Sequence, residues 1–574
     1  MHVIPVRSSC VISAFPSDPK DVILWQDLGG KGSTPVVSDK LSGKQQQLLD
    51  KAVASLGKLV PEMAGASVER AVWELKAAAP DALPIVGPII GLNHYWVAAG
   101  IRDDVGFAGG IGKFLADYVV DGEPPFELTV VDSNRYYPWV KRSRNFVVDK
   151  VRESYAYTYA NTFPEHQPPL DAGRPTCRVS GVYGALKQQG GVMDERCGWE
   201  QCTYLATPNP EENTYKSVIN RECGLVMEKC GVIDLSMYGK LEIKGPDAAR
   251  FVNYAFASDI PEMSTMNIGY ALTPKGRLFS RMRIIHHVST ERDPVFLLMA
   301  RPEAEQRDFS WLQYLAREHD FNVHISDVTD YLGCVAIMGP LSRDILSQLT
   351  STNLSEEAFP YRTAKLIRLR AIPVIACMDS ATGELGWQLY HGRADSLRVF
   401  ESLMQAGLKF GIGSFGRLAF NSLRIEKGEK FWGHELTIDY NPVEAGIEDS
   451  LNLNKEVSWN LDFNFVGDSN IRELIKTPPE RKLHLLALDS QDVQGNTVEY
   501  VPDGMEAVTQ GGKIVGHTTS GCFGYNAQKS LAFAYISTNL PQSGEPLCVE
   551  LVGRSVPAHI LEKPPILPHH LRST

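Results

Sequence analysis

The feature that most constrains the fold of this chain is an internal repeat near its middle. Residues 241–252 (LEIKGPDAARFV) and 335–346 (VAIMGPLSRDIL) share a short apolar strand, a Gly-Pro turn and a helix with an arginine on its exposed side. Similar sequences at two places in a chain indicate similar structural units. The sequence therefore predicts two related halves, each containing this strand and helix.

The segments before the repeat show different sequence patterns. Apolar residues recur at helical spacing over residues 44–63, which predicts one amphipathic helix. Residues 93–100 (NHYWVAAG) are typical of a strand, and the glycine-rich residues 108–113 (AGGIGK) are expected to open a helix that ends near Asp121. Residues 131–185 alternate aromatic, charged and Pro-rich stretches without periodicity, as expected of a connecting subdomain.

The sequence pattern changes again in about the last hundred residues. Short strand-like runs at close spacing, separated by Gly-containing turns, predict a small β-rich domain. The predicted fold class is therefore a multidomain mixture of α/β and α+β parts. We place these parts at residues 1–130, 131–200, 201–478 and 479–574.

Composition excludes several classes of partner and site. The formal net charge of −11 offers no basic surface for nucleic acid. No window reaches the roughly 18 uninterrupted apolar residues that a membrane-spanning helix needs. The ten cysteines contain no CxxC pair and the closest two, Cys197 and Cys202, have no histidine cluster nearby, so we expect free thiols and no metal site. The first fifteen residues do not resemble a clear transit peptide.

The glycines of AGGIGK are the first candidate binding feature. Gly109, Gly110 and Gly112 at a helix start would let the backbone approach a phosphate or the edge of a ring. A simple packing turn at the start of a helix explains them equally well. No GxGxxG follows a strand anywhere in the sequence, so these motifs alone do not predict a complete dinucleotide fold.

The second candidate is residues 382–390 (TGELGWQLY). Here Glu384 stands in a Gly-flanked turn between two predicted strands. A carboxylate held in this way could accept the paired N–H groups of a pterin or a guanidinium. An exposed hairpin turn without a binding role is the other interpretation.

The third candidate is residues 421–446. Arg424 and Glu426 are two residues apart on a predicted helix and so lie on different faces, which favours two separate structural pairings. The loop-rich stretch after them, with Trp432 and Glu444, is suited to lining a pocket.

These segments carry a resemblance to a known family. The ordered motifs LPIVGP (83–88), DGEPPFEL (121–128), LTPKGR (272–277), TGELGW (382–387), NPVEAG (441–446) and QKSLAFAY (528–535) resemble those of the dimethylglycine and sarcosine dehydrogenase family. From about residue 215 onward the chain also resembles the glycine cleavage T protein, an aminomethyltransferase.

The resemblance implies a fold and a chemistry. It implies a partial FAD-dependent oxidoreductase domain, with the chain beginning inside it, then a connector, an aminomethyltransferase-like folate-binding body and a β-barrel. The family oxidises an N-methyl group of dimethylglycine or sarcosine on FAD and transfers the one-carbon unit to tetrahydrofolate. The implied partners are an N-methylated glycine and electron-transfer flavoprotein, and the implied location is the mitochondrial matrix.

The resemblance also implies site residues. The positions that match family folate contacts are Met282, Glu384, Gln388, Leu389, Tyr390, Arg424 and Asp449. The positions that match the flavin edge are Gly100, Gly109, Gly110 and Gly112.

Several family positions carry different residues in this chain. Arg281 stands where the family has an acid, Ala381 and Asp449 replace aromatic residues, and Phe107 replaces a histidine after the loop of residues 101–106. An acid beside the folate nitrogens would stabilise a cationic iminium. A second positive charge at about 5 Å would instead repel the iminium by roughly 3 kcal/mol. We therefore expect impaired transfer, and the alternative is a non-catalytic folate-binding or regulatory protein, similar to the regulatory subunit of pyruvate dehydrogenase phosphatase.

Overall fold

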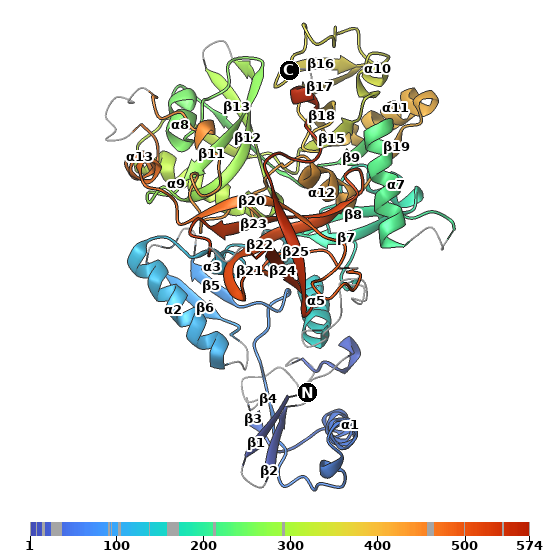
Figure 1. The fold of residues 1–574 in the computed structure, drawn as a ribbon, viewed down its shortest axis with the longest axis vertical. Helices are drawn as coiled ribbons and strands as arrows, with labels where there is room; N and C mark the ends of the chain where they lie inside the picture. Colours follow the sequence, from blue (N-terminus) through green and yellow to red (C-terminus); the bar gives the residue numbers. More distant parts are fainter. Residues whose placement is uncertain are drawn as a thin grey trace. The chain divides into compact units, whose positions relative to one another are not determined.

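The protein divides into two compact units, Met1–Pro175 and Thr176–Thr574. The computed structural model, drawn in Figure 1, describes residues 2–6, 9–13, 18–24, 37–89, 92, 94–101, 105–136, 138–157, 171–209, 214–289, 293–455, 464–498, 500–541 and 545–572.

The first unit consists of helices and short paired strands. The helix expected over residues 44–63 is confirmed: it begins after Ser42, which forms a capping box with Gln45, and ends before Pro61. The described elements of the first unit are β1 (His2–Val6), β2 (Ser9–Ser13), η1 (Pro19–Asp21), β3 (Val37–Ser38), α1 (Gly43–Leu59), η3 (Pro61–Met63), β4 (Trp73–Glu74), β5 (Ile85–Pro88), β6 (Trp96–Ala99), α2 (Val105–Asp121), α3 (Phe126–Thr129), α4 (Pro138–Arg142) and α5 (Arg144–Tyr157).

The glycine-rich segment lies inside a helix, which corrects one expectation. β6 pairs with β5, Gly100 follows with a φ of +67°, and α2 begins at Val105. Gly109, Gly110 and Gly112 are therefore past the first turn of α2, where backbone N–H groups are used within the helix. They are exposed, and no atom lies within 4 Å of where a Cβ would stand on them. Residues 102–104 of the preceding loop lie outside the described part of the chain.

The second unit contains two related sheets, as the repeat predicted. One sheet has the strand order β11-β12-β13-β10-β14 and the other β16-β17-β18-β15-β9-β19. The first half is β10 (Gly239–Lys244), α8 (Ala248–Ala255), β11 (Thr265–Leu272), β12 (Leu278–Ser289), β13 (Pro294–Ala300) and α9 (Glu305–Glu318), and its sheet also contains β14 (His324–Asp327), which stands directly before β15 in the chain. The second half is β15 (Leu332–Met338), α10 (Ser342–Leu346), β16 (Ala364–Leu369), β17 (Ile372–Cys377), β18 (Gly386–Gly392), α11 (Ser396–Gly407) and β19 (Gly413–Ser414).

The two halves exchange one strand. β9 (Gly231–Asp234) precedes the first half in the chain but pairs with β15 in the second sheet. β14 precedes the second half but pairs with β10 in the first sheet. This exchange ties the two halves together.

The Gly-Pro turn of the repeat has the same geometry in both copies. Gly245 and Gly339 have φ angles of +133° and +130°, which favour glycine. A Cβ on Gly245 would lie 2.7 Å from the Asn322 carbonyl oxygen, and one on Gly339 would lie 2.5 Å from that of Lys229. Close backbone packing therefore explains why both turns contain glycine.

The two sheets meet along β11 and β16. The Met266 amide donates to the Arg362 carbonyl at 2.9 Å, and the Ala364 amide donates to the Ser264 carbonyl at 2.8 Å. Figure 1 shows the green strands β11 to β13 on one side of this junction and the yellow strands β15 to β18 on the other. Side chains from β12 can therefore reach side chains on β17 and β18.

The C-terminal β-rich domain is a closed six-stranded barrel, as expected. Its strand order is β20-β23-β22-β21-β24-β25, and its interior is apolar. The remaining elements are α6 (Tyr183–Gln188), β7 (Gly191–Arg196), β8 (Trp199–Leu205), α7 (Tyr215–Glu228), α12 (Arg417–Glu426), α13 (Asp468–Lys476), β20 (Arg481–Leu488), β21 (Ala507–Gln510), β22 (Lys513–Gly524), β23 (Lys529–Ser537), β24 (Leu547–Leu551), β25 (Arg554–Leu561) and α14 (His569–Arg572). The mixed multidomain fold class is confirmed.

Candidate functional site

Strand β12 carries two arginines toward the junction of the sheets. Arg281 and Arg283 are two residues apart, so both side chains leave the same face of the strand. Met282 between them points to the opposite face, into the hydrophobic core of the first half. A buried guanidinium requires a compensating charge or acceptor, and each arginine has one.

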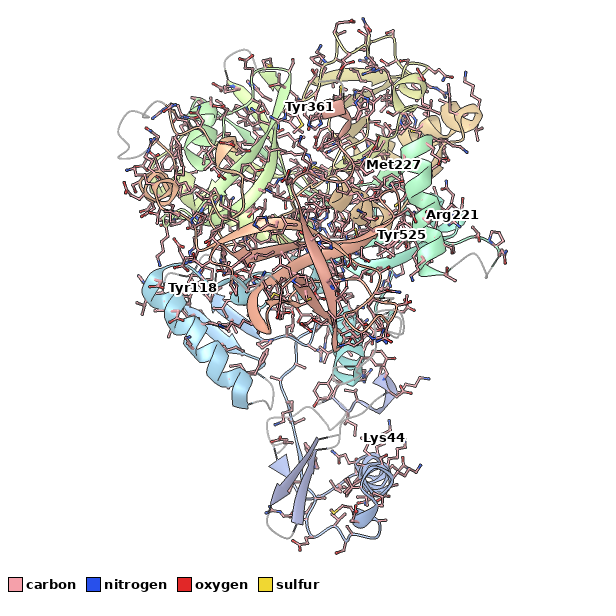
Figure 2. All side chains as sticks on the ribbon, in the orientation of Figure 1. Lys44, Tyr118, Arg221, Met227, Tyr361 and Tyr525 are labelled. Atoms are coloured by element: carbon pink, nitrogen blue, oxygen red, sulfur yellow. The ribbon has the colours of Figure 1, made fainter. Side chains whose placement is uncertain are left out.

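Asp379 is the partner of Arg283 and the centre of a buried hydrogen-bonded group. The Arg283 Nε–H donates to Asp379 Oδ2, Gln388 Nε2 donates to the same oxygen at 3.2 Å, and the Tyr361 hydroxyl donates to Oδ1 at 3.3 Å. The Tyr390 hydroxyl donates to Gln388 Oε1 at 2.8 Å. We call these five residues the Asp379 cluster, and Figure 2 shows Tyr361 between the green and yellow strands.

The charges of the Asp379 cluster stabilise one another. Burial alone raises the pKa of Asp379, but the Arg283 guanidinium outweighs burial and brings the pKa below its usual value. Burial alone lowers the pKa of Arg283, and Asp379 reverses this effect as well. Burial, followed by the Asp379 charge, raises the pKa of the Tyr361 hydroxyl. Asp379 is therefore an ionised carboxylate that accepts hydrogen bonds from three neutral or cationic donors.

Arg281 pairs with a different acid. One of its terminal nitrogens donates to Glu429, which follows α12. The Arg281 Nε is buried and has no hydrogen-bond partner among the residues that the structure describes. The position that the resemblance matches to a family acid thus carries a cation, and its charge is balanced locally by Glu429.

Glu384 is buried, so the interpretation of its turn as exposed is wrong. The side chain forms an ion pair with Lys427, and Glu384 is only 5% exposed. Gly383 allows this close approach, since a Cβ on it would lie 2.8 Å from Lys427 Cγ and its φ is +69°. The turn folds inward because Lys427, at the end of α12, provides the opposite charge. A small hollow remains beside it, lined by Tyr361, Met378, Asp379, Ser380, Gly383, Glu384, Leu385, Gly386, His569 and His570.

Arg424 and Glu426 have separate structural partners, as their spacing predicted. Arg424 donates to Glu435 at 2.6 Å and to the Ser520 hydroxyl at 3.0 Å. Glu426 accepts from the backbone amides of Asn526 and Ala527, both at 2.8 Å. Both side chains fasten α12 to the barrel.

The residues matched to family folate contacts are only partly brought together. Gln388 and Tyr390 belong to the Asp379 cluster, and Glu384 lines the neighbouring hollow. Leu389 lies between them on β18 and points into the core of the second half, since neighbours on a strand face opposite ways. Asp449, in the short helix η9 (Glu448–Ser450), is exposed.

Other positions of interest lie away from the cluster. Ala381 is buried in the core beside α12, and Trp432 is buried in another core. Glu444 accepts from Arg481 Nε at 3.0 Å at the base of β20. These three residues therefore support the surrounding framework.

Sequence reasoning missed five residues of the site: Arg283, Tyr361, Asp379, Lys427 and Glu429. One signal was available, because the alternation of a strand places Arg283 on the face of Arg281. The others come from loops and helix ends distant in sequence, and only the three-dimensional fold brings them to β12.

Within the described ranges, no group of three or more His, Cys, Asp or Glu side chains could hold a metal ion. No helix in that part of the chain is both long and apolar enough to cross a lipid bilayer. The nine cysteines placed by the structure are free, and seven of them are buried.

Three protein families match segments of this chain. The GCVT N-terminal domain matches residues 182–455, and the glycine cleavage T-protein C-terminal barrel domain matches residues 481–566. The FAD dependent oxidoreductase central domain matches residues 121–179. The first two matches cover the paired sheets and the barrel.

Curated relatives extend the similarity over most of the chain. Mouse mitochondrial dimethylglycine dehydrogenase is 38% identical over 524 residues, covering 90% of this chain and 58% of the relative. Mouse mitochondrial sarcosine dehydrogenase is 28% identical, covering 89% and 59%. The mouse mitochondrial pyruvate dehydrogenase phosphatase regulatory subunit is 27% identical, covering 81% and 53%. The chain thus spans less than two thirds of these relatives.

A solved structure supports the fold of the second unit. The glycine cleavage system aminomethyltransferase T from Bartonella henselae aligns with a TM-score of 0.56 at 19% identity, covering 68% of this chain and 98% of that protein. At this identity the likeness concerns the fold alone. The sequence matches show that the chain is similar to dimethylglycine and sarcosine dehydrogenases over most of its length, and that it contains the GCVT N-terminal domain and the T-protein C-terminal barrel domain.

Proposed function

We propose that the second unit binds tetrahydrofolate at the Asp379 cluster and the adjoining hollow. The observation that carries this proposal is the buried, ionised Asp379 beside Glu384, since carboxylates pair with the adjacent N–H groups of a pterin. Gln388 adds an amide, and Tyr361 adds an aromatic face at the rim. The hollow itself measures only about 20 Å³, far below the roughly 300–1,000 Å³ of a typical ligand pocket, so a pterin requires the site to open.

Other residues expected to contact folate instead hold in place the strands and the helix that carry the site. Met282 and Leu389 pack in the cores that hold β12 and β18, and Arg424 fixes α12, which presents Lys427 to Glu384. Asp449 is exposed, and no described contact joins it to the cluster. We therefore assign ligand contacts to Glu384 and the Asp379 cluster, and positioning roles to Met282, Leu389 and Arg424.

We propose that the natural chemistry of this module is folate-dependent one-carbon transfer, and that transfer is impaired. Bound tetrahydrofolate supplies the nitrogens that accept a one-carbon unit. Glu384 and Asp379 would orient the pterin, while the cation at Arg281 would oppose an iminium. By resemblance to the relatives, the donor is an N-methylated glycine such as dimethylglycine or sarcosine, the electron acceptor is electron-transfer flavoprotein, and the location is the mitochondrial matrix.

A non-catalytic role is the second candidate. It is favoured by the Arg281–Glu429 ion pair, which occupies the position of the family's acid. A regulatory subunit of pyruvate dehydrogenase phosphatase is also among the relatives. In this case folate binding would persist and one-carbon transfer would remain absent after the charge at residue 281 is reversed.

The described residues of the first unit do not fit FAD. Pyrophosphate binds at the N-terminus of a helix that follows a parallel strand and a glycine-rich turn. Here Gly109, Gly110 and Gly112 lie within α2, and β5 and β6 are antiparallel. Residues 1–574 alone should therefore be purified colourless, without flavin absorbance after incubation with excess FAD. A yellow protein that reduces an electron acceptor with dimethylglycine would overturn this expectation.

The folate proposal is tested by removing the Glu384 carboxylate. Glu384→Ala is expected to weaken tetrahydrofolate binding about tenfold or more, because a hydrogen bond to a charged group contributes about 1.5–3 kcal/mol. Calorimetric titration measures the dissociation constant.

A matched variant separates the carboxylate from its ion pair. Lys427→Met breaks the same Glu384–Lys427 pair but retains the acid, so it should weaken binding much less than Glu384→Ala does. Equal affinity for tetrahydrofolate in the intact protein and in Glu384→Ala would show that Glu384 does not contact the ligand. Equal losses in both variants would show that only the ion pair matters.

A further inference from the structure

A segment after the barrel crosses from β25 to the hollow beside Glu384. Along residues 564–570, the Pro564 ring packs on Gly428, with its Cγ 2.7 Å from where a Cβ on that glycine would stand. The Ile566 amide then donates to the Glu426 carbonyl at 3.3 Å. These contacts lead the segment along the end of α12.

The end of this segment lines the hollow beside Glu384. The His569 amide donates to the Gly383 carbonyl at 2.6 Å, in the turn that carries Glu384. The His570 ring stacks on Tyr361 with the ring centroids 4.1 Å apart and the planes 6° apart. Both histidines line the hollow together with Asp379 and Glu384.

His570 occupies a position that suits a flat ligand ring. The Tyr361 hydroxyl donates to Asp379, which fixes the tyrosine ring at the rim of the cluster. A heteroaromatic ring that bound Asp379 and stacked on the same face of Tyr361 would collide with the imidazole. The protein therefore fills this stacking position with its own aromatic side chain.

The attachment of the segment is weak enough to be reversed. None of the residues 564–570 is buried, and its described backbone contacts to α12 and to the Gly383 turn are single hydrogen bonds. Segments with few buried apolar contacts open at low free-energy cost. Displacement would leave the cluster and the barrel core intact.

We propose that residues 564–570 form a displaceable strap that competes with folate for the Asp379 cluster, with His570 in the place of the ligand's ring. This inference rests on the proposed folate site and adds a means of regulating it. Tetrahydrofolate must displace the strap to bind, so its apparent affinity is lower than that of an open site.

The strap is tested with His570→Ala in the full chain and with a chain that ends after Lys563. Calorimetric titration with 5-formyltetrahydrofolate should show binding about fivefold tighter in His570→Ala, the scale of one aromatic stacking contact, and tighter still in the shortened chain. His324→Ala, at an exposed histidine at the far edge of the first sheet, is the matched control and should leave the affinity unchanged.

A second measurement separates failure of the strap from failure of the folate site. A synthetic peptide of residues 562–574 should bind the shortened chain, and 5-formyltetrahydrofolate should displace it. If folate binds the intact chain and both variants equally, the strap is refuted and the folate site stands. If the peptide binds but folate binds none of the chains, the folate proposal fails. The proposed competition between the strap and folate then fails as well. A peptide that does not bind refutes the strap irrespective of folate.

Discussion

Replacing Glu435 by alanine is expected to lower the free energy of unfolding of the second unit by about 3–5 kcal/mol. Arg424 and Glu435 are both 0% exposed and form an ion pair of 2.6 Å. Without the acid, the Arg424 guanidinium stays buried without its compensating charge. The Phe431 amide and the Ser520 hydroxyl also lose the acceptor that Glu435 provides. The large effect follows from desolvation, because neither group can turn to solvent.

Urea unfolding monitored by tryptophan fluorescence measures this change. Glu473→Ala is the matched control, since Glu473 pairs with Lys476 at 2.7 Å but is 74% exposed, and its loss should cost less than about 1 kcal/mol. Equal losses of unfolding free energy in Glu435→Ala and Glu473→Ala would contradict the large contribution assigned to the buried Arg424–Glu435 pair. If an Arg424 variant loses folate binding, its stability should therefore be measured before the loss is attributed to a missing ligand contact.

Exchanging the charges of Arg281 and Glu429 is expected to raise one-carbon transfer to tetrahydrofolate by up to about 100-fold. The double variant Arg281→Glu, Glu429→Arg preserves the ion pair and places an acid on β12 at the family position. An unpaired cation at about 5 Å would repel the iminium by roughly 3 kcal/mol, which corresponds to about two orders of magnitude in rate. Because Glu429 compensates part of the Arg281 charge, this value is the upper limit of the expected gain. The measurement is the rate at which tetrahydrofolate captures a formaldehyde equivalent supplied as an iminium donor.

Two controls define this result. Arg281→Glu alone should be less active than the double variant, because it places two carboxylates together and raises their pKa values. The exchange Glu473→Lys, Lys476→Glu reverses an exposed pair on α13 and should leave the rate unchanged. An unchanged rate in the Arg281/Glu429 exchange would show that residue 281 does not face the reacting centre, and would favour the non-catalytic role.

The repeat allowed much of the fold to be predicted, because it depends on local patterns. The strand, Gly-Pro turn and helix of each copy follow from apolar spacing and from the glycine that the turn requires. The exchange of β9 and β14 between the sheets could not be predicted. Both are short four-residue strands, and their pairing depends on contacts made far along the chain.

The same distinction holds for the candidate site. The separate pairings of Arg424 and Glu426 were predictable, because two positions on one helix fix the angle between their side chains. The partner of Glu384 is 43 residues away and that of Arg283 is 96 residues away, and no local pattern specifies either. The position of the α2 start was also missed, because glycines usually indicate a turn, whereas α2 accommodates them in its interior at a cost of about 1 kcal/mol each relative to alanine.

The central claim, that folate binds at the Asp379 cluster, is tested most directly by hydrogen–deuterium exchange with and without 5-formyltetrahydrofolate. The amides of β18, over residues 386–392, and those of the preceding turn, over residues 378–385, are predicted to gain protection when the ligand is present. The cavity of the barrel lined by Lys216, Phe523, Tyr525 and Lys529, where Figure 2 labels Tyr525, should remain unchanged. Protection confined to the barrel cavity, or no change in residues 378–392 at saturating ligand, would contradict the assignment.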